Sequence, residues 1–381
     1  MALAMFALCA FFLLIAAHPF VTYPLTLYFI RARGWRPRFV PTDGPQRMAI
    51  CVCAYNEEGI IEQKAENLLE IKRAFPDTEI AIYVDGATDR TAEILSRYSD
   101  EFKLHISPQR YGKTHGMNLL VAQTTAPIVI FTDANVMVDV NSLRALPGYF
   151  SNPEVGCVCG HLKYVNSHET VTAQNGSAYW RLEEFIKTME SDTGSAMGAD
   201  GSLFAIRREL HNPPPDDIID DMFVSLSILC DGYRIVRAPN VIAYEKSVTS
   251  AQEEFRRKVR IACQAFNVHR LLWPRLRKLS ALDLYKYISH KFIRWLSIYW
   301  LVCAALSFEA GMISAGSPIA GLIIIALGIM VLSVGVLAQL PIITQVADLI
   351  SAFVATGLGV WRSLSGDHFQ TWSPASSIRR A

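Results

Sequence analysis

Two long stretches of this chain, one toward each end, carry no Asp, Glu, Lys or Arg. The first runs from Met1 to Ile30, and the second lies between Glu309 and Asp348. A helix needs about 20 apolar residues to cross the hydrocarbon core of a bilayer. Both stretches are long enough, so we expect a soluble middle part flanked by membrane segments.

The first stretch is predicted to be a retained transmembrane anchor over residues 1–30. It lacks the basic n-region and the small-residue cleavage site of a signal peptide, and it is too long for one. Four arginines follow it and nothing basic precedes it: Arg31, Arg33, Arg36 and Arg38. Because basic flanks stay inside, we expect the next domain to be cytoplasmic, at a bacterial-type inner or plasma membrane.

The second apolar region is predicted to hold a hairpin, with spans near 292–312 and 317–340. Basic residues after Pro341–Trp361 favour an inside C-terminus, so this segment is expected to be interfacial or re-entrant; whether it spans the bilayer stays open. The remaining divisions are amphipathic or interfacial helices at 246–290, membrane and interfacial helices at 291–361, and a cytoplasmic tail at 362–381.

The composition argues against some partners and sites. A formal net charge of +1 gives no reason to expect nucleic acid as a partner. Eight cysteines include two C-x-C pairs, Cys51 with Cys53 and Cys157 with Cys159. The two members of each pair share one face of a strand, and neither pair has the spacing of a zinc site, so small apolar packing is the simpler interpretation.

The middle of the chain, residues 47–245, alternates short apolar runs with amphipathic segments. We predict strands at 48–54, 79–84, 102–106 and 128–132, and helices at 62–75 and 91–98. This alternation indicates an α/β domain with a largely parallel sheet and flanking helices.

Polar clusters follow three of these runs, where each predicted strand ends. Asn56, Asp85 and Asp133 occupy these positions, and the pair Asp220-Asp221 follows later. Ligands of open α/β sheets bind beyond the carboxyl ends of the strands, so the first three should converge. Carboxylates there suit a divalent cation, and one of them could act as base for an acceptor hydroxyl.

Each cluster also has a simpler explanation when it is taken alone. Asp220-Asp221 suits a helix N-terminus, Asp85-Gly86 suits a turn, and Asp133 suits an Asx turn at a strand end. The Gly-x-Gly-x-x-Gly and Gly-x-x-x-x-Gly-Lys-Ser/Thr motifs are absent from the sequence, which disfavours a Rossmann dehydrogenase or a P-loop NTPase.

Six segments together resemble the membrane-bound family 2 glycosyltransferases, which have the GT-A fold. They are Ala-Tyr-Asn-Glu-Glu at 54–58, Val-Asp-Gly-Ala-Thr-Asp-Arg-Thr at 84–91, Arg-Tyr-Gly-Lys at 110–113, Phe-Thr-Asp-Ala-Asn at 131–135, Gly-Ala-Asp-Gly-Ser-Leu-Phe-Ala-Ile-Arg-Arg at 198–208 and Ile-Asp-Asp-Met-Phe-Val at 219–224. Any one segment is weak, but all six in the family's order are specific. The resemblance extends over about residues 48–265 and is nearest to bacterial synthases of cellulose, hyaluronan or poly-N-acetylglucosamine.

The resemblance implies a role for each matching residue. On the donor side, the nucleotide-sugar-binding residues would be Ala54, Tyr55, Asn56, Glu57, Asp85, Lys113, Asp133, Arg257 and Arg260. Among these, Asp85 would accept hydrogen bonds from uracil, and Asp133 with Asn135 would hold Mg²⁺ or Mn²⁺. On the other side, Asp221, with Asp220 beside it, would be the catalytic base. Gly198, Asp200 and Gly201 would line the acceptor site.

Two departures from the family pattern bear on function. The metal motif ends in neutral Asn135, and Asp139 is a possible helper. The Gln-x-x-Arg-Trp segment of the processive enzymes is replaced by Arg257-x-x-Arg260-Ile261, which removes the aromatic platform under the acceptor sugar. Trp180 or Trp295 could supply a surface instead. The basic stretch could also lie on anionic lipid, through Arg256 and Lys258.

The function expected from these features is an inverting transferase that uses a nucleotide sugar, with UDP as the expected nucleotide. A divalent cation would assist, and the acceptor would be a glycan or a lipid-linked glycan at the cytoplasmic membrane face, in polysaccharide synthesis. Processive synthesis and addition of a single sugar both remain open, as does the oligomeric state. A nucleotide-binding transporter or adaptor and a sugar nucleotidyltransferase are the alternatives from other classes.

Overall fold

The computed structural model describes residues 1–32, 47–165, 171–246 and 250–371, and of 171–179 it describes the backbone alone. At its centre is one eight-stranded sheet, with the strand order β3-β2-β1-β4-β7-β6-β8-β5. The strands are β1 Met48–Ala54, β2 Glu79–Asp85, β3 Lys103–Ser107, β4 Ile128–Thr132, β5 Met137–Val138, β6 Val155–Tyr164, β7 Leu203–Arg207 and β8 Arg234–Glu245.

The sheet is mixed, with parallel and antiparallel pairs. Strands β3, β2, β1 and β4 run parallel, and β6 is parallel to β8. Strand β7 is antiparallel to both β4 and β6, and β5 is antiparallel to β8. The prediction of an α/β domain is confirmed, and the parallel half matches the four strands predicted from the sequence within one residue at each end.

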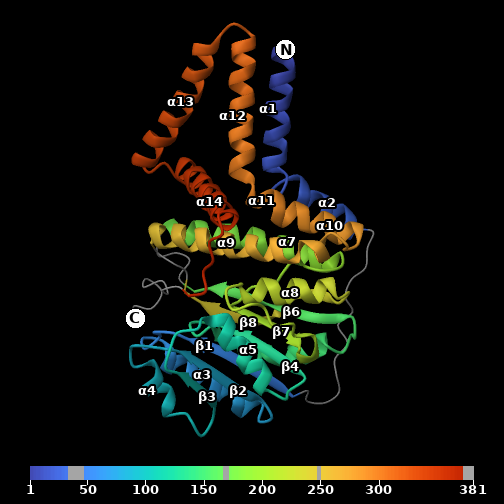
Figure 1. The fold of residues 1–381 in the computed structure, drawn as a ribbon, viewed down its shortest axis with the longest axis vertical. Helices are drawn as coiled ribbons and strands as arrows, with labels where there is room; N and C mark the ends of the chain where they lie inside the picture. The colour runs from blue at the N-terminus through green and yellow to red at the C-terminus, as the bar shows by residue number, and fades with distance from the viewer. Residues whose placement is uncertain (33–46, 166–170, 247–249, 372–381) are drawn as a thin grey trace.

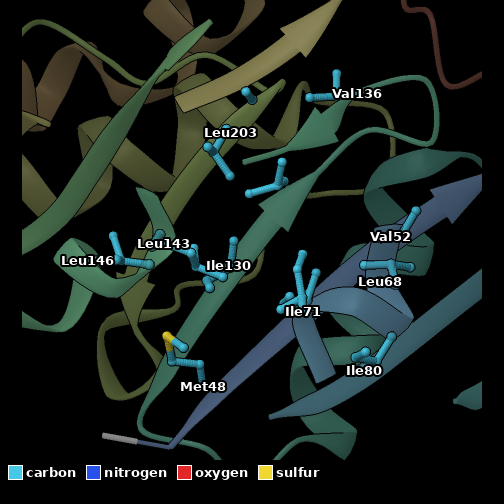
Figure 2. Close-up of a cluster of buried hydrophobic side chains, with 14 of the residues drawn as sticks. Met48, Val52, Leu68, Ile71, Ile80, Ile130, Val136, Leu143, Leu146 and Leu203 are labelled. Carbon is cyan, nitrogen blue, oxygen red and sulfur yellow. The ribbon is translucent and has the colours of Figure 1, made fainter. Parts of the chain in front are cut away.

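Helices cover both faces of the sheet because successive strand side chains point to opposite sides. On one face, Val52 of β1 packs with Leu68 and Ile71 of helix α3, Ile61–Ala74 (Figure 2). On the other face, Cys51 packs in a second core with side chains of α5 (Lys113–Gln123) and α8 (Asp220–Cys230). Both C-x-C pairs therefore lie in or against this second core, and all eight cysteines are free.

The helices between the two end regions have the following bounds: α3 Ile61–Ala74, α4 Thr91–Ser96, α5 Lys113–Gln123, η1 Ser142–Ala145, α6 Leu146–Tyr149, α7 Val171–Asp192, η2 Arg208–Leu210, α8 Asp220–Cys230 and α9 Ala251–Leu276. Helices α7 and α9 lie between the sheet and the helices of the two apolar ends (Figure 1). They form a layer that separates the sheet from the apolar helices.

The two end regions of the chain form helices that either lie at this layer or project from it (Figure 1). They are α1 Ala2–Ala17, α2 Thr22–Arg31, α10 Ala281–Tyr287, a single π-helical turn η3 Ile288–Phe292, α11 Ile293–Trp295, α12 Ser297–Ser314, α13 Pro318–Leu337 and α14 Pro341–Leu364. Helices α12, α13 and α14 are long and apolar enough to cross a membrane. Helix α1 packs along α12 on one side of the projection (Figure 1).

Two of these segments differ in detail from what the sequence suggests. The segment predicted as one anchor is divided into α1 and α2, which are bent by 57° at a break. Helix α14 is long and apolar enough to span a bilayer, yet its C-terminal part packs tightly on α9. A Cβ on Gly359 would lie 2.6 Å from the Ala262 Cβ, so glycine permits this close crossing. Membrane insertion of either segment stays a prediction.

Candidate active site

The loop after β2 is organised by Asp85, which is buried. Its carboxylate accepts backbone hydrogen bonds from Tyr111 at 2.7 Å and from Gly112 at 3.0–3.1 Å. Gly112 has a φ of +98°, a conformation that favours glycine. Asp85 therefore fixes the turn that leads into Lys113, and its expected contact with a nucleotide base remains a prediction.

The predicted nucleotide loop after β1 is joined to the loop after β2. Asn56, with a φ of +52°, accepts a hydrogen bond from the Thr88 amide at 2.8 Å. The backbone N–H of Glu57 donates to the Thr91 hydroxyl at 2.8 Å. Ala54, at the end of β1, is buried in the core beneath this junction. The two loops are thus hydrogen-bonded to each other and form one continuous edge of the site.

A cation–π pair, Arg110 over Tyr55, lies at the same edge. The guanidinium of Arg110 lies 3.6 Å from the centre of the Tyr55 ring. Arg110 also approaches the Asp85 carboxylate, at 3.8 Å. Arg110 was not assigned a role of its own from the sequence, although the Arg-Tyr-Gly-Lys segment contains it.

Lys113 joins the acidic residues of separate elements. Its ammonium lies 2.7 Å from Asp133 Oδ1 and 3.6 Å from Asp220 Oδ2. Burial lowers the pKa of Lys113, but the carboxylates of Asp133, Asp220 and Asp221 outweigh burial and raise it well above its ordinary value. Lys113 is consequently a permanent positive charge at the centre of three carboxylates.

Asp221 has the properties of a base that works near neutral pH. Burial, followed by the charge of Asp220, raises the pKa of Asp221 from 3.8 to about 7, although Lys113 opposes the shift. Gly201 lies against this carboxylate, since a Cβ there would be 3.0 Å from Asp221 Oδ2 and 3.1 Å from the Lys113 ammonium. A general base is most effective when its pKa is close to the working pH.

The predicted cation ligands are only partly placed for a metal. The side chain of Asp133 is about one-third exposed, while Asn135 donates a hydrogen bond to Glu245 Oε1 at 2.9 Å. Within the described residues, no group of three His, Cys, Asp or Glu side chains is arranged to hold an ion. These residues fit a cation whose remaining ligands come from a diphosphate, which is how Mg²⁺ is commonly bound. Asp139 instead accepts a hydrogen bond from the Ser142 amide, at 2.8 Å.

The predicted acceptor residues lie in a loop, Ala196–Ser202, beside Asp221. Gly198 has a φ of +110°, and the next amide, of Ala199, donates to the Ser225 hydroxyl at 2.9 Å. Asp200 is ion-paired with the buried Lys187 of α7. We call this segment the acceptor loop, after the role predicted for it.

The two predicted arginines of α9 differ in their surroundings. Arg257 forms a two-point ion pair with Glu254, at 2.8 and 3.0 Å. Burial and the charge of Arg257 lower the pKa of Arg260 to about 10, against the attraction of Asp133 and Asp221. Arg260 is thus close enough to the acidic centre to interact with it electrostatically.

The aromatic rings considered as substitute platforms are placed differently. Trp295 is buried, with its ring packed against Phe266, His269 and Tyr287. Trp180 is partly exposed and packs edge-on against Tyr164, with Lys187 over its ring at 5.3 Å. Trp295 is therefore removed from consideration as an exposed surface.

A segment predicted as a simple tail returns to the site. Residues 365–371 follow α14 and are fastened by side-chain amides to backbone carbonyls: Gln264 to Phe369 at 2.8 Å, Asn267 to Asp367 at 3.0 Å and Gln370 to Tyr111 at 2.9 Å. His368 contacts Asp217, at 2.7 Å, in the loop before Asp220. This C-terminal strap lies against the Tyr111–Gly112 turn, and no sequence signal pointed to it.

Comparison with known proteins agrees with this architecture. Residues 49–212 match the family model Glycosyl transferase family 2. An N-acetylglucosaminyltransferase of Rhizobium meliloti (strain 1021) is 24% identical over 295 residues, which is 68% of each protein. A poly-beta-1,6-N-acetyl-D-glucosamine synthase of Staphylococcus aureus (strain MSSA476) is 24% identical over 207 residues, 52% of this chain. The chain spans about half the length of this second relative, since the match covers 50% of it.

A solved structure shares the whole fold. The mannosyltransferase from Pyrobaculum calidifontis, in complex with GDP-Man and Mn²⁺, superposes with a TM-score of 0.75 at 20% identity. The match covers 94% of this chain and 99% of that one. At this identity the likeness establishes the fold, and the family model establishes the class of enzyme. The chain therefore contains a family 2 glycosyltransferase domain over residues 49–212, within a GT-A fold.

Proposed function

We propose that this enzyme transfers a sugar from a UDP-sugar to a hydroxyl of a glycan or lipid-linked glycan, with inversion at the anomeric carbon. The observation that carries the proposal is the placement of Asp221, a carboxylate with a pKa near 7, against Gly201 and beside Lys113. UDP-N-acetylglucosamine is the first donor to test, because the relatives are named for N-acetylglucosamine transfer.

In the proposed reaction, the oxygen of the acceptor hydroxyl bonds to the anomeric carbon while Asp221 accepts the proton of that hydroxyl. The bond from that carbon to the diphosphate oxygen breaks, and its electron pair leaves with UDP. Lys113 and Arg260 place positive charge beside the departing diphosphate. A divalent cation, Mg²⁺ or Mn²⁺ held by Asp133 and Asn135, would neutralise part of the same charge.

The membrane face is also part of the proposal. Helices α12, α13 and α14 would hold the enzyme in a bacterial inner or plasma membrane, with the catalytic domain in the cytoplasm. An acceptor attached to lipid would then meet the acceptor loop from the side of α7 and α9, the layer next to the apolar helices (Figure 1).

Purified full-length protein in lipid nanodiscs tests the reaction directly. Labelled UDP-N-acetylglucosamine, then a panel of other UDP-, GDP- and dTDP-sugars, is incubated with Mg²⁺ or Mn²⁺ and membrane lipids. Sugar transfer by the wild type and its loss in Asp221→Asn support the proposal. Asp231→Asn, at the other end of α8, is a matched control. Absence of transfer and of nucleotide release across the panel would refute it.

Product length separates the two modes of synthesis. Ile261 stands where the processive enzymes have a stacking Trp, and Trp295 is buried, which favours short products. Size analysis of the labelled product decides: one added sugar supports single addition, whereas a long polymer means that another surface holds the growing chain.

A further inference from the structure

Helix α7 connects the membrane-facing helices to the acceptor loop. Helix α2 packs on it from one side, and α10 and α11 also lie at this layer (Figure 1). The acceptor loop follows α7 after a short turn. Near the C-terminal end of α7 lies Glu190, whose side chain is fully buried.

The two oxygens of Glu190 contact three different parts of the chain. Oε1 accepts a hydrogen bond from the Tyr23 hydroxyl of α2 at 2.5 Å and contacts His290 Nδ1 of η3 at 2.7 Å. Oε2 accepts the backbone N–H of Met197, in the acceptor loop, at 3.0 Å. One carboxylate therefore joins the N-terminal helix pair, the start of the C-terminal membrane region and the loop beside the catalytic base.

A second set of contacts fixes the same helix end. The buried ammonium of Lys286, from α10, lies 3.1–3.3 Å from the carbonyl oxygens of Glu190, Thr193 and Ser195. A cation is favourable at a helix C-terminus, where carbonyl groups lack partners. Both ring nitrogens of His290 face carboxylates, since Nε2 lies 3.1 Å from Glu183.

The loop itself is held residue by residue. The Ala196 amide donates to the Ile235 carbonyl at 2.9 Å, the Met197 amide to Glu190, and the Ala199 amide to Ser225. The Ser225 hydroxyl in turn donates to the Asp221 carbonyl at 2.6 Å. The Met197 bond is the one among these that leads to the membrane-facing helices.

A buried charged cluster is often only structural, because the attraction between its charges is offset by their desolvation. A structural role alone would require the carboxylate of Glu190 to bind the packed helices. Its second oxygen instead ends on the backbone of the acceptor loop, four residues before Gly201. The Glu190 side chain thus contacts both the packed helices and the acceptor loop.

We propose that Glu190 is a positioning residue that sets the acceptor loop in its working position only while Tyr23 and His290 are docked on it. The acceptor site is then complete only when the membrane-facing helices are assembled on α7. The role of the loop in acceptor binding rests on the proposed function. The link through Glu190 between the packed helices and the position of the loop does not depend on it.

Two Tyr-to-Phe variants test the link in full-length protein in nanodiscs. Tyr23→Phe removes the hydroxyl bound to Glu190. Tyr285→Phe removes a hydroxyl at the same interface that is bound to Thr26, at 2.6 Å, and is the matched control. Glu190→Gln serves as a second probe of the hub. Amide hydrogen exchange is followed over a peptide spanning residues 195–202, together with nucleotide affinity and kinetics.

Tyr23→Phe is expected to speed exchange of this peptide by about tenfold, the scale of one lost buried hydrogen bond. It should raise the KM for the acceptor and leave the affinity for UDP unchanged. Glu190→Gln should do the same or more, and Tyr285→Phe neither. Equal exchange in wild type and Tyr23→Phe, or equal acceleration in both Tyr variants, overturns the proposal. If no sugar is transferred by the wild type, the proposed function fails, and the exchange result still decides the link.

Discussion

The role proposed for Asp221, that of the catalytic base, predicts how activity depends on pH. Burial and the charge of Asp220 raise its pKa from 3.8 to about 7. Only the carboxylate can accept a proton, so kcat/KM should increase with pH and level off above about 7. The ionisation of Lys113 does not contribute to this rising limb of the pH profile. Its neighbouring carboxylates outweigh the effect of burial and hold the pKa of Lys113 above the ordinary value.

Replacing Asp220 by Asn removes the charge that contributes to the raised pKa of Asp221 and leaves the contribution of burial. The whole shift is about three pH units, from 3.8 to about 7, and burial is its larger part. We therefore expect the limb to move to lower pH by roughly one unit. Near pH 6 the fraction of Asp221 in the carboxylate form would rise about fivefold, for a pKa that falls from about 7 to about 6.

The measurement is UDP release at low donor concentration and saturating acceptor, from about pH 5 to pH 9. Asp231→Asn controls for the loss of a carboxylate from the same helix, because Asp231 pairs with Arg275 at 2.6 Å at the far end of α8. A wild-type profile that is flat across this range would show that Asp221 is not the base. A limb that stays in place or moves upward in Asp220→Asn would refute the electrostatic argument.

Three further predictions follow from single contacts. Asp221→Asn should lower kcat by about 10²–10⁴-fold, yet raise the Tm above pH 7, because it removes a buried charge that Asp220 repels; an unchanged kcat would contradict the first part. The buried Lys64 donates a hydrogen bond to the Val136 carbonyl at 2.5 Å, beneath the loop that contains Asp133. Lys64→Met should therefore lower the free energy of unfolding by about 1–3 kcal/mol in denaturant titrations and raise the Mn²⁺ concentration needed for half-maximal activity. Unchanged stability would contradict this prediction. Gly112→Ala should weaken UDP affinity in calorimetry by about tenfold, because its Cβ would lie 2.4 Å from the Gln370 carbonyl oxygen of the strap. The control Gly232→Ala is also at positive φ but faces open space, so it should affect stability alone. Equal UDP affinity in the two variants would count against a role for the strap.

Much of the catalytic half of the fold could be predicted because its signals are local. A strand such as β1 is a short apolar run, and its end is marked by the polar residues that follow. The edge of the sheet where Asp85 and Asp133 lie follows from the direction of parallel strands. The antiparallel strand β7 between β4 and β6 could not be predicted, because strand order depends on contacts between distant segments.

The candidate site divides in the same way. Asp133, Asp220, Asp221 and Lys113 were expected and do lie together. Glu245 was not expected, since it lies at the end of β8 and reaches Asn135 only after the chain has crossed the sheet.

The class of the protein could be inferred from the residues alone, because apolar ends, strand-helix alternation and acidic clusters occur in the order of one family. These features depend on residue type and on spacing within a few residues. Two features became visible in the folded chain alone: a C-terminal strap reaches the Tyr111–Gly112 turn, and Glu190 joins Tyr23, His290 and Met197. The physical reason is distance along the chain: Glu190 lies 167 residues from Tyr23 and 100 from His290. A buried carboxylate acquires its partners only when packing brings such segments together.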